Sequence, residues 1–157
     1  MAATDDPRDV VVALAEHEEA MSALYSAYAK EFPAVGDLWT ALARDEHGHG
    51  ALLRSLSGRT DDLAAFVDNR EYDLADVQAD TARLRNLAQI TPVAGFPLQE
   101  AFRVALKLED SLIESQILVA YDGDPPEVTK VVETLREQTE KHQRRLREKF
   151  ERPGAPS

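Results

Sequence analysis

Residues 41–56 read ALARDEHGHGALLRSL, and their apolar spacing is that of one face of a helix. The apolar residues of this face, counted from just before the segment, are Trp39, Leu42, Leu53 and Leu56. Steps of three and four residues are typical of an amphipathic helix, and continuing them through the gap leads to Glu46 and His49. This face is therefore predicted to carry a carboxylate and an imidazole one turn apart. Because burying an unpaired carboxylate is costly, Glu46 is expected to have a hydrogen-bonding partner or a metal.

Two glycines, Gly48 and Gly50, lie inside the same predicted helix. Each costs about 1 kcal/mol relative to alanine in a helix interior. We interpret them as clearance for a closely packed neighbouring element. A sequence that is not optimised for helix stability is an equally simple explanation.

The overall composition narrows the class of protein. The chain has 157 residues, no cysteine and a formal net charge of −11. One domain spanning residues 1–157 is expected for this length, and the missing cysteines exclude disulfides, thiolate zinc sites and cysteine-bound iron. The acidic balance argues against a nucleic-acid partner, whose binding depends on cationic contacts to phosphate. No apolar run is long enough for a membrane span, and residues 1–8 lack the features of a signal peptide, so a cytoplasmic protein with no membrane partner is expected.

Apolar periodicity elsewhere predicts three more long helices. Together the four expected helices cover roughly residues 8–32, 37–56, 97–121 and 126–151. Asp6 and Pro7 form part of a helix-start signal for the first helix, and Asp37 is predicted to cap the second. The connection over 57–96 is expected to hold two helical pieces, 61–68 and 73–89, followed by a loop at 91–97. A connection of this length allows the chain to cross a helical bundle from end to end.

Each of the four long helices has polar residues where its apolar pattern calls for apolar ones. These residues are Glu18 in the first helix, Glu46 and His49 in the second, Glu109 in the third, and Thr139 and His142 in the fourth. Carboxylate-bridged dimetal bundles use inward glutamates from two helices and a Glu-x-x-His motif from each of the other two. The carboxylates offset the charge of two divalent cations, and each imidazole supplies one terminal ligand.

The pattern resembles the rubrerythrin-like branch of the ferritin-like superfamily. The resemblance is carried by Glu18 with Tyr25, by LARDEHGH at 42–49, by ALKLE at 105–109, and by His142. It covers roughly residues 10–56 and 96–150. It implies an all-α, ferritin-like four-helix bundle with a long helical crossover between the second and third helices. It also implies that the metal ligands are Glu18, Glu46, His49, Glu109 and His142.

The resemblance further implies a non-haem di-iron protein, an oxidase, peroxidase or ferroxidase that oxidises Fe(II) with O2 or H2O2. Two iron ions are expected, with manganese or zinc as alternatives, and no catalytic residue beyond the ligands is expected. Glu18 and Glu109 would bridge or chelate, Glu46 would chelate, and the two histidines would each bind one iron. Rubrerythrins proper carry a cysteine-ligated iron domain, which this chain lacks, so turnover would need an external electron donor. A homodimer is compatible with this interpretation.

One position departs from the family pattern, which has a glutamate three residues before His142 where this chain has Thr139. The second metal site is therefore one carboxylate short. Two other hypotheses follow: a structural or interaction protein whose metal site has decayed, and a mononuclear or zinc-filled site without redox activity. Tyr25 is expected either to hydrogen-bond a ligand carboxylate or to be an aromatic core residue. His17 and His47 fall outside the apolar faces and are expected on the surface.

Overall fold

The computed structural model of the chain describes residues 6–58, 73–112 and 126–150. Within these ranges it is all-helical, which confirms the all-α part of the predicted fold class. The elements are α1 (Pro7–Glu31), the short 3-10 helix η1 (Pro33–Val35), α2 (Gly36–Ser55), α4 (Leu74–Ala94), α5 (Leu98–Leu112) and α6 (Pro126–Phe150). None of these helices combines the length and the apolar character that crossing a bilayer requires.

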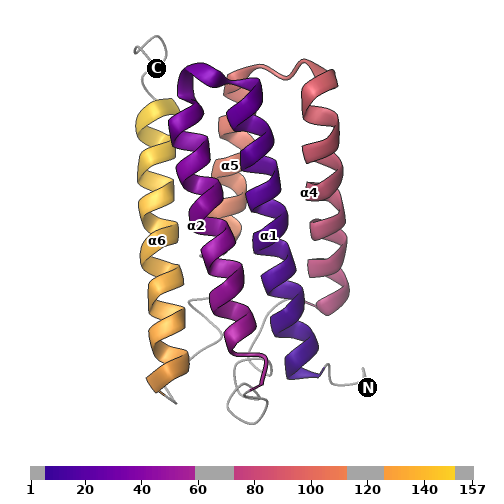
Figure 1. Cartoon of the computed structure of the whole chain (residues 1–157), viewed down its shortest axis with the longest axis vertical. Coiled ribbons are helices and arrows are strands. Elements are labelled where there is room, and N and C mark those ends of the chain that lie inside the picture. Colours follow the sequence, from indigo (N-terminus) through magenta and orange to yellow (C-terminus); the bar gives the residue numbers. More distant parts are fainter. Residues whose placement is uncertain (1–5, 59–72, 113–125, 151–157) are drawn as a thin grey trace.

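The helices lie side by side along the long axis of the molecule (Figure 1). Helices α1 and α2 form a hairpin through η1, α4 packs along α1, and α5 packs against α6. Helices α1 and α6 run in one direction along this axis, whereas α2 and α5 run in the other. Helix α4 runs along the length of the molecule to the end where α5 begins.

Helix α4 is longer than predicted. The sequence pattern predicts a loop over residues 91–97, but the predicted start of that loop is wrong, because the helix continues through Pro92 to Ala94. Proline lacks a backbone N–H, but near the end of a helix it removes only one hydrogen bond. Gly95 then ends the helix in the left-handed conformation, with φ 68°, which glycine adopts without steric cost. The predicted helix at 61–68 and residues 113–121 of the third predicted helix lie outside the described residues.

The starts of the first two helices differ in how well they were predicted. Asp6 caps α1 as expected, because its side chain accepts a hydrogen bond from the Arg8 backbone N–H at 2.9 Å, and Pro7 follows it. The predicted cap of α2 is wrong. Helix α2 begins at Gly36 directly after η1, so Asp37 lies inside its first turn, where its charge still favours the helix dipole.

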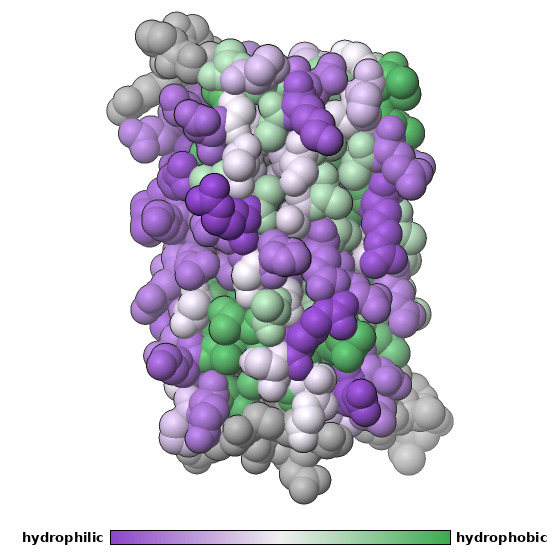
Figure 2. Space-filling view, viewed as in Figure 1, coloured by the Kyte–Doolittle hydropathy of each residue, from purple (hydrophilic) through white to green (hydrophobic). Residues whose placement is uncertain are grey.

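Two apolar clusters form the core, and the buried glutamates and histidines predicted to bind metal lie between them. Along α2, Trp39 and Leu42 belong to one cluster and Leu53 to the other, with Glu46 and His49 in between. Along α1 and α6, which run in the opposite direction, the order is reversed, and Glu18 and His142 again separate members of the two clusters. Hydrophilic side chains cover most of the face seen in Figure 2, as expected for amphipathic helices with a common interior. The fold therefore places one polar layer across an otherwise apolar core.

Only one of the two glycines in α2 provides the predicted clearance. A Cβ atom at Gly50 would lie 3.1 Å from Cγ of Glu19 and 3.2 Å from the carbonyl oxygen of Ala15, both on α1. At Gly48 the same atom would meet nothing within 4 Å. The clearance interpretation is confirmed for Gly50 and is wrong for Gly48.

We expect the alanine variants of these glycines to have opposite effects on stability. Gly48→Ala should raise the free energy of unfolding by up to about 1 kcal/mol, because only helix propensity changes. Gly50→Ala should lower it, because the new methyl group would press on the backbone carbonyl of Ala15, which cannot rotate away. Urea unfolding of both variants beside the parent measures the difference. Equal stabilisation by both substitutions would show that α1 and α2 are not in tight contact at Gly50.

Candidate metal centre

The five predicted ligands come together in the polar layer, although their role as metal ligands stays a prediction. They form two groups that could each hold a metal ion, and within each group the ligand atoms lie within 4.8 Å of one another. The His49 triad consists of Glu18, Glu46 and His49, and the His142 triad consists of Glu46, Glu109 and His142. All five side chains are buried, with residue exposures between 0% and 3%.

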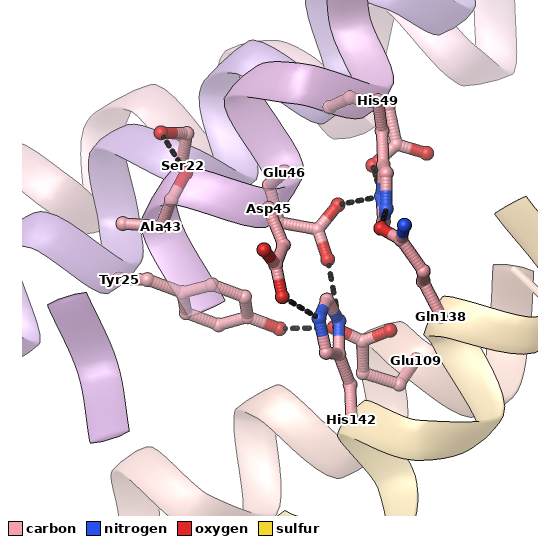
Figure 3. Close-up of polar contacts among 10 residues, drawn as sticks. Ser22, Tyr25, Ala43, Asp45, Glu46, His49, Glu109, Gln138 and His142 are labelled. Carbon is pink, nitrogen blue, oxygen red and sulfur yellow. Dashed lines mark hydrogen bonds and ion pairs between the residues drawn. The ribbon is translucent and has the colours of Figure 1, made fainter. Parts of the chain in front are cut away.

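Glu46 is shared by the two triads and lies between the two histidines (Figure 3). Its Oε2 atom is 3.1 Å from Nδ1 of His49, and its Oε1 atom is 3.0 Å from Nδ1 of His142. Each histidine also faces one further carboxylate: Glu18 Oε2 is 4.0 Å from His49 Nδ1, and Glu109 Oε1 is 3.4 Å from His142 Nδ1. The two oxygens of Glu46 therefore face different histidines, and its expected role as a chelating ligand stays a prediction.

Several atoms of the candidate ligand residues lack a hydrogen-bond partner. Among the described residues, the buried unpaired atoms include Oε2 of Glu18, Oε1 of Glu46, Oε2 of Glu109 and Nδ1 of His142. The close approach of Glu46 Oε1 and His142 Nδ1 brings opposite charges together without forming a hydrogen bond. Buried polar atoms are normally paired, and a divalent cation bound to carboxylate oxygen and imidazole nitrogen would satisfy them. This donor set fits a two-metal centre.

The Nε2 atom of each histidine, which we call the outer nitrogen, forms a hydrogen bond with a side chain of the opposite helix, α2 or α6. His142 on α6 donates from Nε2 to Oδ2 of Asp45 on α2, at 3.0 Å. His49 on α2 donates from Nε2 to Oε1 of Gln138 on α6. His49 also donates from Nδ1 to Oε2 of Glu46, at 3.1 Å. If an imidazole held in this way at Nε2 loses its Nδ1 proton, the lone pair of that nitrogen becomes free for a metal. Sequence reasoning missed both partners, although each lies four residues before the histidine of its own helix.

Tyr25 contacts the centre from α1. Its hydroxyl donates a hydrogen bond of 2.9 Å to Oε1 of Glu109, which confirms the expected contact with a ligand carboxylate. The ring also packs in the aromatic cluster, 5.6 Å from Trp39 between ring centroids, so the core interpretation holds as well. Thr139 is buried, with 2% exposure, at the position where the family pattern has a carboxylate.

Burial and charge shift the acid–base equilibria of the centre in different directions. Burial, together with the charge of Glu46, raises the pKa of Glu18 and raises the pKa of Glu109 to about 8. Burial opposes ionisation of Glu46, but contacts with Glu18, His142 and His49 lower its pKa well below the usual range. Burial likewise opposes charging of His142, but Glu109 and Glu46 raise its pKa to about 10. Without metal the centre holds several protons, so metal binding is expected to release them.

Of the two histidines expected on the surface, one was predicted wrongly. His47 is exposed, as predicted. His17 is only 4% exposed, and its Nε2 atom lies 2.7 Å from Oδ2 of Asp80 on α4. The prediction assumed a bundle of four helices, in which α1 would have one buried face. In the structure α4 also packs against α1 and buries a second face. His17 belongs to neither triad.

No family model, curated protein or solved structure matches this chain. The chemical interpretation of the centre therefore depends on its own geometry and on the spacing of the candidate ligand residues.

Proposed function

We propose that this chain is a ferritin-like, non-haem di-iron protein with oxidase, peroxidase or ferroxidase activity towards O2 or H2O2. The observation that carries the proposal is the pair of buried triads sharing Glu46, with unpaired ligand atoms in both. Buried glutamates and histidines projecting from helices into a bundle core are the ligand set of dinuclear carboxylate centres. Iron bound there would supply the electrons that reduce the oxidant.

The charges around the centre are consistent with two divalent cations. Glu18, Glu46 and Glu109 provide three negative charges when they are ionised. Asp45 adds a fourth through its hydrogen bond with His142, and so provides the charge that Thr139 does not. Four negative charges balance the four positive charges of two divalent ions, which reduces the cost of burying them.

The remaining residues of the centre have positioning roles in this proposal. Tyr25 holds one oxygen of Glu109 and leaves the other free for a metal. The apolar clusters on either side limit the access of water, which strengthens the interactions inside the centre. We further propose that electrons for catalytic turnover come from outside this chain, whose 157 residues include no cysteine that could bind an electron-transfer iron centre.

Thr139 supports a second candidate function. With a hydroxyl in place of the fourth carboxylate ligand, the centre could hold one metal, or zinc, without redox activity. A structural or interaction role would then follow from the bundle alone. Metal stoichiometry and reaction with an oxidant distinguish these candidates.

The proposal is tested by anaerobic titration of the metal-free protein with Fe(II), followed by rapid mixing with O2 or H2O2. We expect two Fe(II) ions per chain and a near-ultraviolet absorbance that grows as Fe(III) forms. His47→Gln is the matched control, because His47 lies exposed on the same helix, and it should leave both results unchanged. One ion per chain, or no absorbance change with either oxidant, would favour the second candidate.

A further inference from the structure

Helices α2 and α6 hold each other's histidine through residues in equivalent positions. Asp45 lies four residues before His49 but contacts His142, and Gln138 lies four residues before His142 but contacts His49. The two imidazole rings stack between these contacts, with centroids 5.7 Å apart and an interplanar angle of 27°. The two histidines are therefore held in the same way at Nε2, and the side chains that hold them differ chemically.

That difference is one of charge. The outer partner of His142 is a carboxylate, whereas the outer partner of His49 is a neutral amide. A hydrogen bond to an ionised acceptor is roughly twice as strong as one between neutral groups. A carboxylate behind a histidine ligand also makes its metal-facing nitrogen a stronger donor, and losing such a partner typically costs about 10- to 100-fold in metal affinity.

We propose that Asp45 and Gln138 make the two metal sites unequal, so that the site beside His142 fills before the site beside His49. This inference rests on the proposed two-metal centre. Glu46 contributes one oxygen towards each histidine and so favours neither site. Tyr25 weakens Oε1 of Glu109 as a ligand by donating to it, and this is the oxygen that faces His142, but Oε2 of Glu109 carries no hydrogen bond. Asp45, with its full negative charge, is therefore the larger influence.

The sequence pattern alone predicts the opposite order. It assigns Glu46 to the metal beside His49 and leaves the other site short of a carboxylate at Thr139. Two features of the structure favour the order proposed here instead, namely the division of Glu46 between both histidines and the contact of Asp45 with the opposite helix.

The order of filling can be read directly from the histidine nitrogens. The protein is labelled with 15N-histidine and titrated with Zn(II) from zero to two equivalents, with long-range 1H–15N spectra assigned through single-histidine variants. The ring signals of His142 should change within the first equivalent and those of His49 within the second. The other two histidines, His17 and His47, belong to neither triad and serve as internal references.

Exchanging the two outer partners provides the matched test. The double variant Asp45→Asn/Gln138→Glu keeps the net charge and both hydrogen-bond acceptors, and it should invert the order so that His49 responds first. Asp45→Asn alone should weaken zinc binding beside His142 about 10- to 100-fold. Both side chains are only partly buried, so the folded state is expected to survive.

The outcomes separate the two proposals. One possible result is that the ring signals of His49 and His142 change in parallel as zinc is added, and another is that the double variant leaves the order of filling unchanged. In either case the inference about Asp45 and Gln138 is wrong while the two-metal centre stands. If zinc changes the ring signals of neither His49 nor His142, the proposed metal centre and the inference built on it are both wrong.

Discussion

Glu46→Gln is expected to abolish both metal sites at once. Glu46 directs one carboxylate oxygen at His49 and the other at His142, so its loss removes a ligand from each triad. The neutral amide would also leave two bound divalent ions with less charge compensation. By contrast, Glu18→Gln should remove only the site beside His49, and Glu109→Gln only the site beside His142, because each of these carboxylates belongs to a single triad.

Calorimetric titration with Fe(II) under anaerobic conditions measures these effects. The parent should bind two ions, the Glu18 and Glu109 variants one ion each, and Glu46→Gln none at concentrations that saturate the parent. Glutamine keeps the volume of glutamate, so circular dichroism should show the same helical content in all four proteins. If Glu46→Gln loses only one ion, Glu46 is a ligand of one metal, as the sequence pattern suggested, and the shared arrangement is wrong.

The metal-free protein is expected to lose about 2 kcal/mol or more of stability as the pH rises from about 5 to about 10. The pKa of Glu109 is raised to about 8, so its stabilisation is present below about 4.5 and is lost as the pH rises through 8. The pKa of His142 is raised to about 10, so its stabilisation is present below about 6.5 and is lost as the pH rises through 10. Glu46 acts in the opposite direction, because its lowered pKa gives stability above about 4.5 that is lost in more acidic solution. Maximum stability is therefore expected near pH 5.

Melting temperatures at pH 5, 7 and 9, measured after chelator treatment and again with excess Mn(II), test this expectation. Metal ions replace the lost protons, so the stabilisation by Mn(II) should grow with pH and reach about 2.7 kcal/mol at a hundredfold excess over the dissociation constant. Glu109→Gln is the control, because it removes one titrating carboxyl group and should flatten the decline between pH 5 and 8. A melting temperature that depends on neither pH nor Mn(II) would favour a bundle without a functional metal centre.

The residues of the centre could be found from sequence because helical periodicity specifies which side of a helix is buried. Glu18, Glu46, Glu109 and His142 interrupt apolar faces, and all four side chains are buried in the structure. His17 could not be placed in this way. It lies outside the main apolar face of α1, and it is buried because α4 packs on a second face of that helix.

The sequence by itself therefore determined the helical class, most of the helix limits and the buried polar layer, since each depends on spacing within one helix. Only the tertiary structure decided how the helices meet across that layer. The sharing of Glu46 and the reciprocal contacts of Asp45 and Gln138 depend on the rotation and axial offset of α2 relative to α6. Periodicity within a helix carries no information about either quantity, because both arise from side-chain packing between helices that are distant in sequence.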